Sequence, residues 1–340
     1  MTKLSYSIAQ IFLGLMLFTG PDPTSALAAP PLTGVLQVIK DYPLPGRATR
    51  WDYMSFNAVR SQMVIAHLGD SAVVVVDTKR KAVIGTVDHI SDVHGVLVIP
   101  ELDRIYASAT GSNELVAIDA RSLKVIARIP TGKYPDGIAY AHSAQKIYVS
   151  NANGESLTVV DARSNKSVAT IALGGSVGNT QYDAVSKHVF VNVQKSKELV
   201  EIDPATDAIV QRTVISGANG NHGLLIEPTL RLAFIACEGN DLLIVLDLRT
   251  KKVLMQFHVG RAPDVLGYDA LHHRLYVASE SGVASVFNVS AAGVTLAGEG
   301  LIGLNAHTLA VDSLTHEVYF PLNERGQPPV LRIMQPVALK

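Results

Sequence analysis

The stretch that decides the fold is PDGIAYAHSAQKIYVSNANGESLTVVDARSNKSVATIA, residues 135–172. It holds four short runs rich in Val, Ile and Tyr, at residues 137–140, 146–150, 157–161 and 167–171. Gly, Asn, Asp or Ser residues separate the runs, which is typical of strands joined by tight turns. The stretch therefore predicts one unit of four short β-strands.

This unit recurs seven times, because three positions repeat in step along the chain. The first is a polar residue at the start of the opening strand, at intervals of about 42 or 43 residues: Asp52, His94, Asp136, Asn179, His222, Asp264 and His307. About 12 residues later stands an apolar, usually aromatic residue: Val64, Tyr106, Tyr148, Phe190, Phe234, Tyr276 and Tyr319. About 13 residues further on, an acidic or amide residue is expected to cap a turn: Asp77, Asp119, Asp161, Asp203, Asp247 and Asn288. This period is typical of four-stranded propeller blades.

The seventh repeat lacks an outer strand, because the chain reaches its end soon after the run 330–333. The run GVLQVIKDYP at residues 34–43 matches the outer strands of other repeats, such as residues 124–130. Pairing it into the last repeat would close the ring and remove exposed sheet edges. No stretch shows a helical period with caps, so we predict an all-β fold. The expected domain is a single seven-bladed β-propeller of four-stranded blades, residues 34–337.

The first residues are typical of an export signal. Lys3 supplies a positive charge, residues 8–18 form an apolar stretch too short to span a bilayer, and Ala26-Leu27-Ala28 matches a cleavage site. We predict a signal peptide at residues 1–28 and a short N-terminal segment at residues 29–33. The protein is then periplasmic or secreted, with no membrane span after cleavage. An uncleaved membrane anchor is the alternative.

Composition bounds the partners and the chemistry. Hydrophobic residues make up 48% of the chain and charged residues 17%, which describes a well-buried globular protein. A formal net charge of −1 gives no reason to expect nucleic-acid binding. Cys237 is the single cysteine, so an internal disulfide is excluded. It follows an apolar run and is expected to be a small core residue.

The repeat resembles the YVTN-family (YncE-like) propellers, which are secreted bacterial proteins with blades of this length. The resemblance rests on IYVSN at residues 147–151, PDGIA at residues 135–139 and VDA at residues 160–162. It covers the chain from about residue 34 to residue 337 and implies the propeller fold. It implies no particular activity, because many such propellers have no assigned activity.

The polar ring carries the candidate site. In a blade, the start of the inner strand and the turn between the second and third strands lie at the same face. The ring should therefore converge, at one channel mouth, with polar residues three or four positions after the aromatic one: His67, Asn151, Gln194, Glu238, Glu280 and Asn323. His94, His222 and His307 are predicted to ligate a divalent metal ion of unknown identity. The same three histidines, with Glu238 and Glu280, are the predicted catalytic residues. The predicted ligand-binding residues are Asp52, Asp136, Asn179, Asp264, His67, Asn151, Gln194 and Asn323.

Three functions fit this ring. The first is an exported propeller that binds a small molecule or a divalent metal ion at the polar mouth of its channel. The second is a metal-dependent hydrolase or lyase, lactonase-like, in which the metal polarises a carbonyl group and a histidine moves the proton. Its resemblance to secreted lactonases and streptogramin-type lyases is one of architecture alone. The third is a scaffold for a protein partner, which would use surface loops. A purely structural ring, filled by water, is the simplest alternative.

Overall fold

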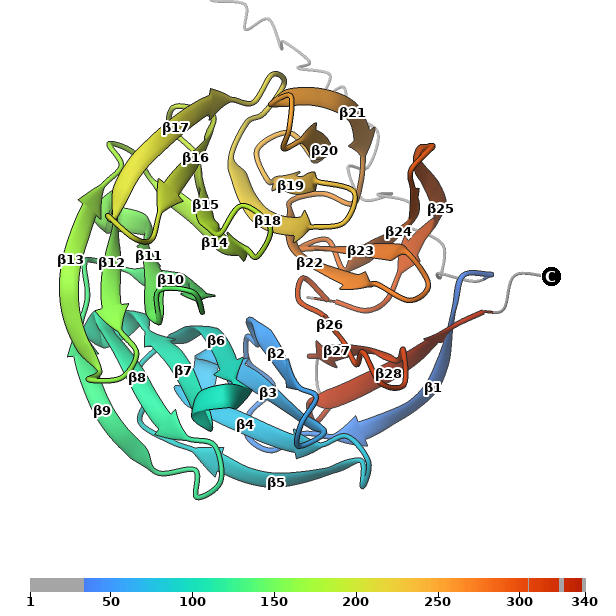
Figure 1. Ribbon diagram of the computed structural model, residues 1–340. Helices are drawn as coiled ribbons and strands as arrows, with labels where there is room; N and C mark the ends of the chain where they lie inside the picture. The colour runs from blue at the N-terminus through green and yellow to red at the C-terminus, as the bar shows by residue number, and fades with distance from the viewer. Residues whose placement is uncertain (1–33, 305, 324–326, 338–340) are drawn as a thin grey trace, which may run out of the picture.

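A computed structural model describes residues 34–304, 306–323 and 327–337 of the chain. The predicted signal peptide and the segment 29–33 lie outside these residues. Seven four-stranded antiparallel sheets surround a central axis (Figure 1), and this confirms the predicted all-β, seven-bladed propeller. Four short 3-10 helices sit in turns, at Leu68–Asp70 (η1), Pro100–Leu102 (η2), Thr110–Ser112 (η3) and Ala152–Gly154 (η4).

In the first six blades, four consecutive strands run from the channel to the outer rim. Blade 1 consists of Met54–Asn57 (β2), Gln62–His67 (β3), Ala72–Asp77 (β4) and Ala82–Val87 (β5). Blade 2 consists of Val93–Ile99 (β6), Arg104–Ala109 (β7), Glu114–Asp119 (β8) and Val125–Pro130 (β9). Blade 3 consists of Pro135–Ala141 (β10), Lys146–Asn151 (β11), Ser156–Asp161 (β12) and Lys166–Ala172 (β13).

The second half of the ring repeats this plan. Blade 4 consists of Val177–Asp183 (β14), His188–Val193 (β15), Glu198–Asp203 (β16) and Ala208–Val214 (β17). Blade 5 consists of Asn221–Glu227 (β18), Leu232–Cys237 (β19), Leu242–Asp247 (β20) and Lys252–His258 (β21). Blade 6 consists of Pro263–Asp269 (β22), Arg274–Ser279 (β23), Val283–Ser290 (β24) and Gly293–Leu301 (β25).

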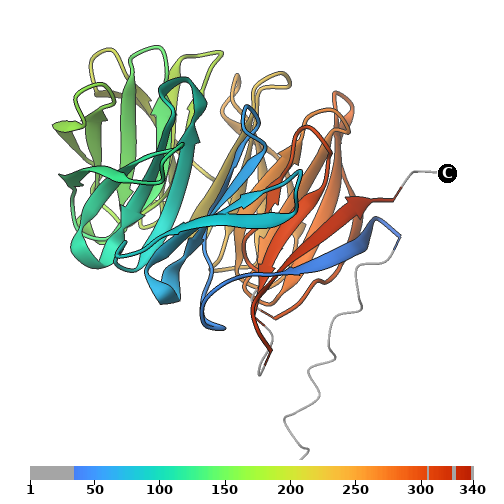
Figure 2. The ribbon, with the colours of Figure 1, turned by 90° about the horizontal axis from the view of Figure 1, so that it is seen from below.

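Blade 7 draws its strands from both ends of the chain. From the channel outward it consists of Ala310–Val311 (β26), Val318–Leu322 (β27), Val330–Pro336 (β28) and Leu36–Pro43 (β1). The ladder between β1 and β28 runs from Leu36 opposite Pro336 to Pro43 opposite Val330. Figure 2 shows these two strands side by side at the rim. The predicted closure by the N-terminal strand is therefore confirmed.

Packing between neighbouring blades forms the core. In blade 3, every residue of β11 and β12 is buried except Lys146 and Asp161 at the strand ends, whereas the outer strand β13 is largely exposed. The aromatic position of the repeat, from Tyr106 to Tyr319, is at most 1% exposed. Burial of one such side chain contributes roughly 1.5–3 kcal/mol. Each repeat thus carries its own share of the core.

The acidic position of the repeat caps the turn after the third strand. Asp161 Oδ1 accepts hydrogen bonds from the backbone N–H of Ser164 at 2.8 Å and from its hydroxyl at 2.7 Å. Matching bonds occur at Asp77, Asp119, Asp203 and Asp247. The prediction is wrong for Asn288, which pairs with Thr295 inside a longer hairpin that turns beyond Ser290.

Cys237 is buried in β19, as predicted for a core residue. Burial raises the pKa of its thiol to about 11, which keeps the thiol protonated at neutral pH.

Among the residues that the structure describes, no helix has the length and apolar character needed to cross a bilayer.

Candidate functional site

The ring position lies on a bulge at the start of the inner strand. In β10, Pro135 pairs with Asn151 and Ile138 pairs with Val149, so Asp136 and Gly137 together oppose the single residue Ser150. The same irregularity occurs in β6, β14, β18 and β22. A bulge of two residues against one redirects side chains. Here it directs the ring residues toward the channel.

The bulge also corrects one predicted residue. His94, Asp136, His222 and Asp264 are each the first of the two bulged residues, whereas in blade 4 that place belongs to Gly178 and Asn179 is the second. The sequence pattern was traced by polar residues, so in blade 4 it led to Asn179 instead of to Gly178, one position earlier. Asn179 nevertheless lies in the channel, since its Oδ1 accepts a hydrogen bond from the hydroxyl of Tyr53 at 2.6 Å.

Tyr53 spans the channel from one side to the other. It belongs to blade 1, yet its hydroxyl bonds Asn179 in blade 4 and lies 3.2 Å from Nε2 of His222 in blade 5. Burial, together with the negative charges of Asp264 and Asp136, raises its pKa well above the ordinary value. The hydroxyl therefore keeps its proton. Tyr53 and Asn179 also line a cavity of about 290 Å³ between the inner strands, so they separate this cavity from the ring.

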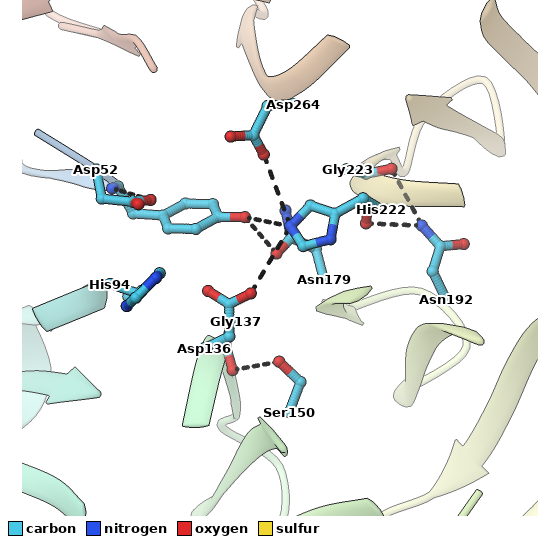
Figure 3. A network of polar contacts seen from close by, with 12 residues as sticks. Asp52, His94, Asp136, Gly137, Ser150, Asn179, Asn192, His222, Gly223 and Asp264 are labelled. Carbon is cyan, nitrogen blue, oxygen red and sulfur yellow. Dashed lines mark hydrogen bonds and ion pairs between the residues drawn. The ribbon is translucent and has the colours of Figure 1, made fainter. Parts of the chain in front are cut away.

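His222 stands at the centre of the ring, between Asp136 and Asp264 (Figure 3). Its Nε2 lies 3.7 Å from Asp136 Oδ2 and 3.6 Å from Asp264 Oδ1, and its Nδ1 lies 3.0 Å from the Gln194 side-chain nitrogen. Burial alone would lower the pKa of His222, but the charges of Glu238 and of these two aspartates outweigh it and raise the pKa to about 9. The ring therefore holds an imidazolium ion at neutral pH.

The carboxylates of the ring repel one another. Burial raises the pKa of Asp264 well above its usual range, and Asp52, Glu238 and Asp136 raise it further, although His222 opposes them. The pKa values of Asp136 and Glu238 are also raised, chiefly by burial. A buried acid whose pKa is raised in this way is typical of a functional site.

Asp264 belongs to two groups of metal-binding donors. One group combines Asp264 with His222 and Glu238, and the other combines it with Glu280 and His307. Within each group the ligand atoms lie within 4.8 Å of one another. Asp264 Oδ1 is buried and makes no hydrogen bond with any residue that the structure describes. Asp264 is thus placed to ligate an ion from either side.

Glu280 carries the second group. Its Oε1 lies 2.8 Å from Nη2 of Arg50, and its Oε2 lies 3.7 Å from Nδ1 of His307. Burial would raise the pKa of Glu280, but His307 and Arg50 lower it below its ordinary value. Glu280 is therefore an ionised donor at neutral pH.

The three histidines predicted as metal ligands do not fall into one donor group. In the described part of the chain, His222 and His307 belong to different donor groups and His94 to none. His94 bonds the carbonyl of Asp92 through Nδ1 at 2.9 Å and the hydroxyl of Tyr134 through Nε2 at 3.1 Å. The three residues come from blades 2, 5 and 7, and carboxylates lie beside His222 and His307. Sequence spacing gives the face of a residue but not its distance across the channel.

Three other predicted residues stabilise loops rather than the ring. His67 stacks on Trp51 with ring centroids 3.6 Å apart, and its Nε2 lies 3.0 Å from the hydroxyl of Thr49. Asn323 accepts a hydrogen bond from the Trp51 indole at 2.9 Å and donates one to the Thr49 carbonyl. Asn151 bonds Thr158 within blade 3 at 3.0 Å. Of the predicted turn residues, Gln194, Glu238 and Glu280 reach the ring residues.

Sequence reasoning missed Arg50 and Tyr53. Arg50 approaches Asp52 at 3.4 Å as well as Glu280, so it is the main permanent cation beside the ring. Tyr53 is the residue after the ring position, where blades 2, 3 and 5 carry Gly95, Gly137 and Gly223. The large side chain of Tyr53, at a position that is glycine in these three blades, is the sequence feature that could have indicated its role in the channel.

Fold and site together define a seven-bladed β-propeller with an acidic, histidine-containing central channel. The profile of the cytochrome D1 heme domain family matches residues 59–298, and the chain belongs to this family. No curated protein sequence matches the chain closely enough to serve as a relative.

Solved structures share the fold at low sequence identity. Hydrazine synthase of Kuenenia stuttgartiensis is 14% identical with a TM-score of 0.71, and the match covers 82% of this chain and 94% of that one. The WD40 repeats of RRP9 are 12% identical with a TM-score of 0.74, over 91% of this chain and 99% of that one. U3-55K is also 12% identical with a TM-score of 0.74, over 90% and 100%. These likenesses show the fold alone.

Proposed function

We propose that this protein binds a divalent transition-metal ion at the mouth of its central channel, with Asp264 as the common ligand. The observation that carries the proposal is the membership of Asp264 in both three-donor groups. Mixed imidazole and carboxylate donors suit Zn²⁺ or a similar ion better than Ca²⁺ or Mg²⁺, which prefer oxygen ligands alone.

The charge balance of the ring supports a cation. Asp52, Asp136, Asp264, Glu238 and Glu280 surround His222, whose positive charge lies 3.6 Å from Asp264 and 3.7 Å from Asp136. Arg50 offsets part of the remaining negative charge. Burial, and after it the repulsion between carboxylates, raises the pKa values of Asp264 and Glu238. A divalent ion bound through the His222 imidazole would displace the extra proton of His222 and would offset this repulsion.

The family is named for a heme, and the described channel does not fit one. Tyr53 crosses the space where a macrocycle would lie, held by Asn179 at 2.6 Å. The cavity beyond Tyr53 measures about 290 Å³. This is at the small end for an ordinary drug-sized ligand.

Metal titration of the purified protein tests the proposal. We expect one equivalent of Zn²⁺ or Mn²⁺ to bind at the ring and Asp264→Asn to weaken binding at least about 100-fold, since even residues beyond the ligands cost 10–100-fold. Asp136→Asn is the matched control, because Asp136 is an equally buried ring carboxylate that belongs to neither donor group. Ring binding that survives Asp264→Asn, or that is lost equally in both variants, would contradict the assignment.

We also propose that the protein is exported, as its N-terminal sequence and its YVTN-like repeats suggest. The supporting residues are Lys3, the apolar stretch 8–18 and the cleavage site at residues 26–28. N-terminal sequencing of the protein from a periplasmic fraction should begin at Ala29. Recovery of the chain only in the cytoplasm, with residues 1–28 intact, would overturn this. The hydrolase or lyase hypothesis and the scaffold hypothesis stay predictions, since no described contact favours either.

A further inference from the structure

A second cluster of metal-binding side chains lies at the far end of the inner strands, away from the ring. Asp269 ends β22 in blade 6, His272 lies in the turn that follows, and His316 precedes β27 in blade 7. Nδ1 of His272 is 2.7 Å from Asp269 Oδ2, and Nδ1 of His316 is 3.0 Å from Asp269 Oδ1. Asp269 is buried, whereas the His272 side chain is 47% exposed. The cluster joins two blades and is open to solvent.

The junction of blades 4 and 5 holds the same arrangement with different side chains. Asp183 ends β14 as Asp269 ends β22, and it accepts a hydrogen bond from Ser186, three residues on, as Asp269 does from His272. Arg231 of the next blade donates to Asp183 at 2.6 Å. Arg231 and His316 occupy the same place in the repeat, three residues before the buried aromatic of their blades, and have φ values of 61° and 62°.

The difference between the two junctions is chemical. At Asp183, a hydroxyl and a permanently charged guanidinium satisfy the carboxylate, and neither is a usual metal ligand. At Asp269, two imidazoles take their places, and imidazole nitrogen is a preferred ligand of Zn²⁺ and related ions. A turn cap and an ion pair would have sufficed for the fold, as Asp183 shows. The two histidines are therefore the feature that needs a further explanation.

We propose that Asp269, His272 and His316 form a second binding site for a transition-metal ion such as Zn²⁺, which links blade 6 to blade 7. Ligands 2.0–2.1 Å from a tetrahedral zinc ion lie about 3.3 Å apart, close to the observed separations of 2.7 and 3.0 Å. All three ligand atoms lie within 4.8 Å of one another. A bound ion would take the place of the two hydrogen bonds between the Asp269 carboxylate and the Nδ1 atoms of His272 and His316, after the three side chains move slightly apart.

The surroundings provide for the remaining coordination. A cavity of about 320 Å³ lies beside the two imidazoles and is also lined by Thr315 and Gln335. It has room for the water that commonly completes a three-residue zinc site.

The location gives the site a structural consequence. Blade 7 has the shortest inner strand of the described residues, β26, and relies on β1 from the other end of the chain. An ion held by Asp269 and His272 on one side and His316 on the other would connect this blade to its neighbour. Binding to the folded state alone raises thermal stability in proportion to the logarithm of ion concentration.

The test uses the full chain without a polyhistidine tag, in the Asp264→Asn background so that the ring site does not contribute. Zn²⁺ binding is measured by calorimetry, and Co²⁺ absorption reports the coordination geometry. We expect one equivalent to bind and to raise the melting temperature. His272→Ser combined with His316→Arg reproduces the Asp183 junction, so it should fold while losing at least about 100-fold in affinity.

Each outcome decides the matter. Zinc affinity that is unchanged in the double variant, or a background protein that binds no zinc, would overturn the proposal. If the double variant were to misfold, His316→Arg alone should still abolish the zinc-dependent shift in melting temperature. The ring site is read separately, in the double variant with Asp264 intact, so the failure of one site cannot be mistaken for the failure of the other.

Discussion

Replacing His222 with Gln should destabilise the metal-free protein in a pH-dependent manner. His222 carries a positive charge between Asp136 and Asp264, and its pKa is raised from 6.5 to about 9. A shift of this size corresponds to about 3 kcal/mol of interaction that favours the charged form. The figure is an upper bound, because Asp264 can take up a proton when the imidazolium is removed. Loss of one partner from a buried ion pair typically costs about 3–5 kcal/mol, which agrees in size.

The pH window follows from the direction of the shift. Because the pKa is raised in the folded state, the stabilisation is fully present below about 6.5 and is lost as the pH rises through about 9. Wild type and His222→Gln should therefore differ by about 2–3 kcal/mol at pH 6.5, on the order of several degrees in melting temperature. The difference should shrink toward zero above pH 9.5.

Chemical denaturation in the presence of EDTA, from pH 6 to pH 10, measures this difference directly. His258→Gln is the control, since His258 lies exposed on the outer strand β21, away from the ring. Groups that do not face His222 titrate alike in both proteins and cancel when the two curves are subtracted. A wild-type minus His222→Gln difference that stays constant across this range would refute the assignment of the charge to His222.

Three further outcomes are expected. Tyr53→Phe leaves the buried Oδ1 of Asn179 without its 2.6 Å hydrogen bond, so the unfolding free energy should fall by about 1–3 kcal/mol; an unchanged denaturation midpoint would contradict this. Deletion of residues 34–43 removes β1 and exposes the edge of β28, so size-exclusion chromatography should show association or aggregation rather than a folded monomeric elution. Cys237 should resist a thiol reagent at pH 8 in the native protein, because burial raises its pKa to about 11, and should react fully in denaturant; rapid native labelling would argue against its burial.

The fold could be predicted because three independent positions repeat with one period. Tyr148 fixes the second strand, Asp161 fixes the turn after the third strand, and the run 34–43 supplies the strand that blade 7 lacks. An error at one position, such as Asn288, leaves the other two registers intact. Redundancy of this kind protects a prediction of architecture.

The site could be predicted only in part, because its geometry depends on contacts across the ring. The bulge in β14 lets Asn179 enter the channel although strand alternation would send it away. Tyr53 reaches the channel from the segment just before β2. The pairing of His94 with Tyr134 instead of with His222 depends on loop shape, which the repeat does not encode. Asp264 was among the predicted residues, but its membership in two donor groups depends on distances across the channel, which the sequence does not give.

Tyr53 crosses the central channel of the propeller and divides it into two parts. Because the Tyr53 hydroxyl contacts Asn179 and His222 on the opposite side, this side chain lies between the ring of acidic residues and the cavity of about 290 Å³. Arg50 and Glu280 keep partly exposed side chains beside the ring, so a ligand that approaches from solvent on this side meets an ion pair first.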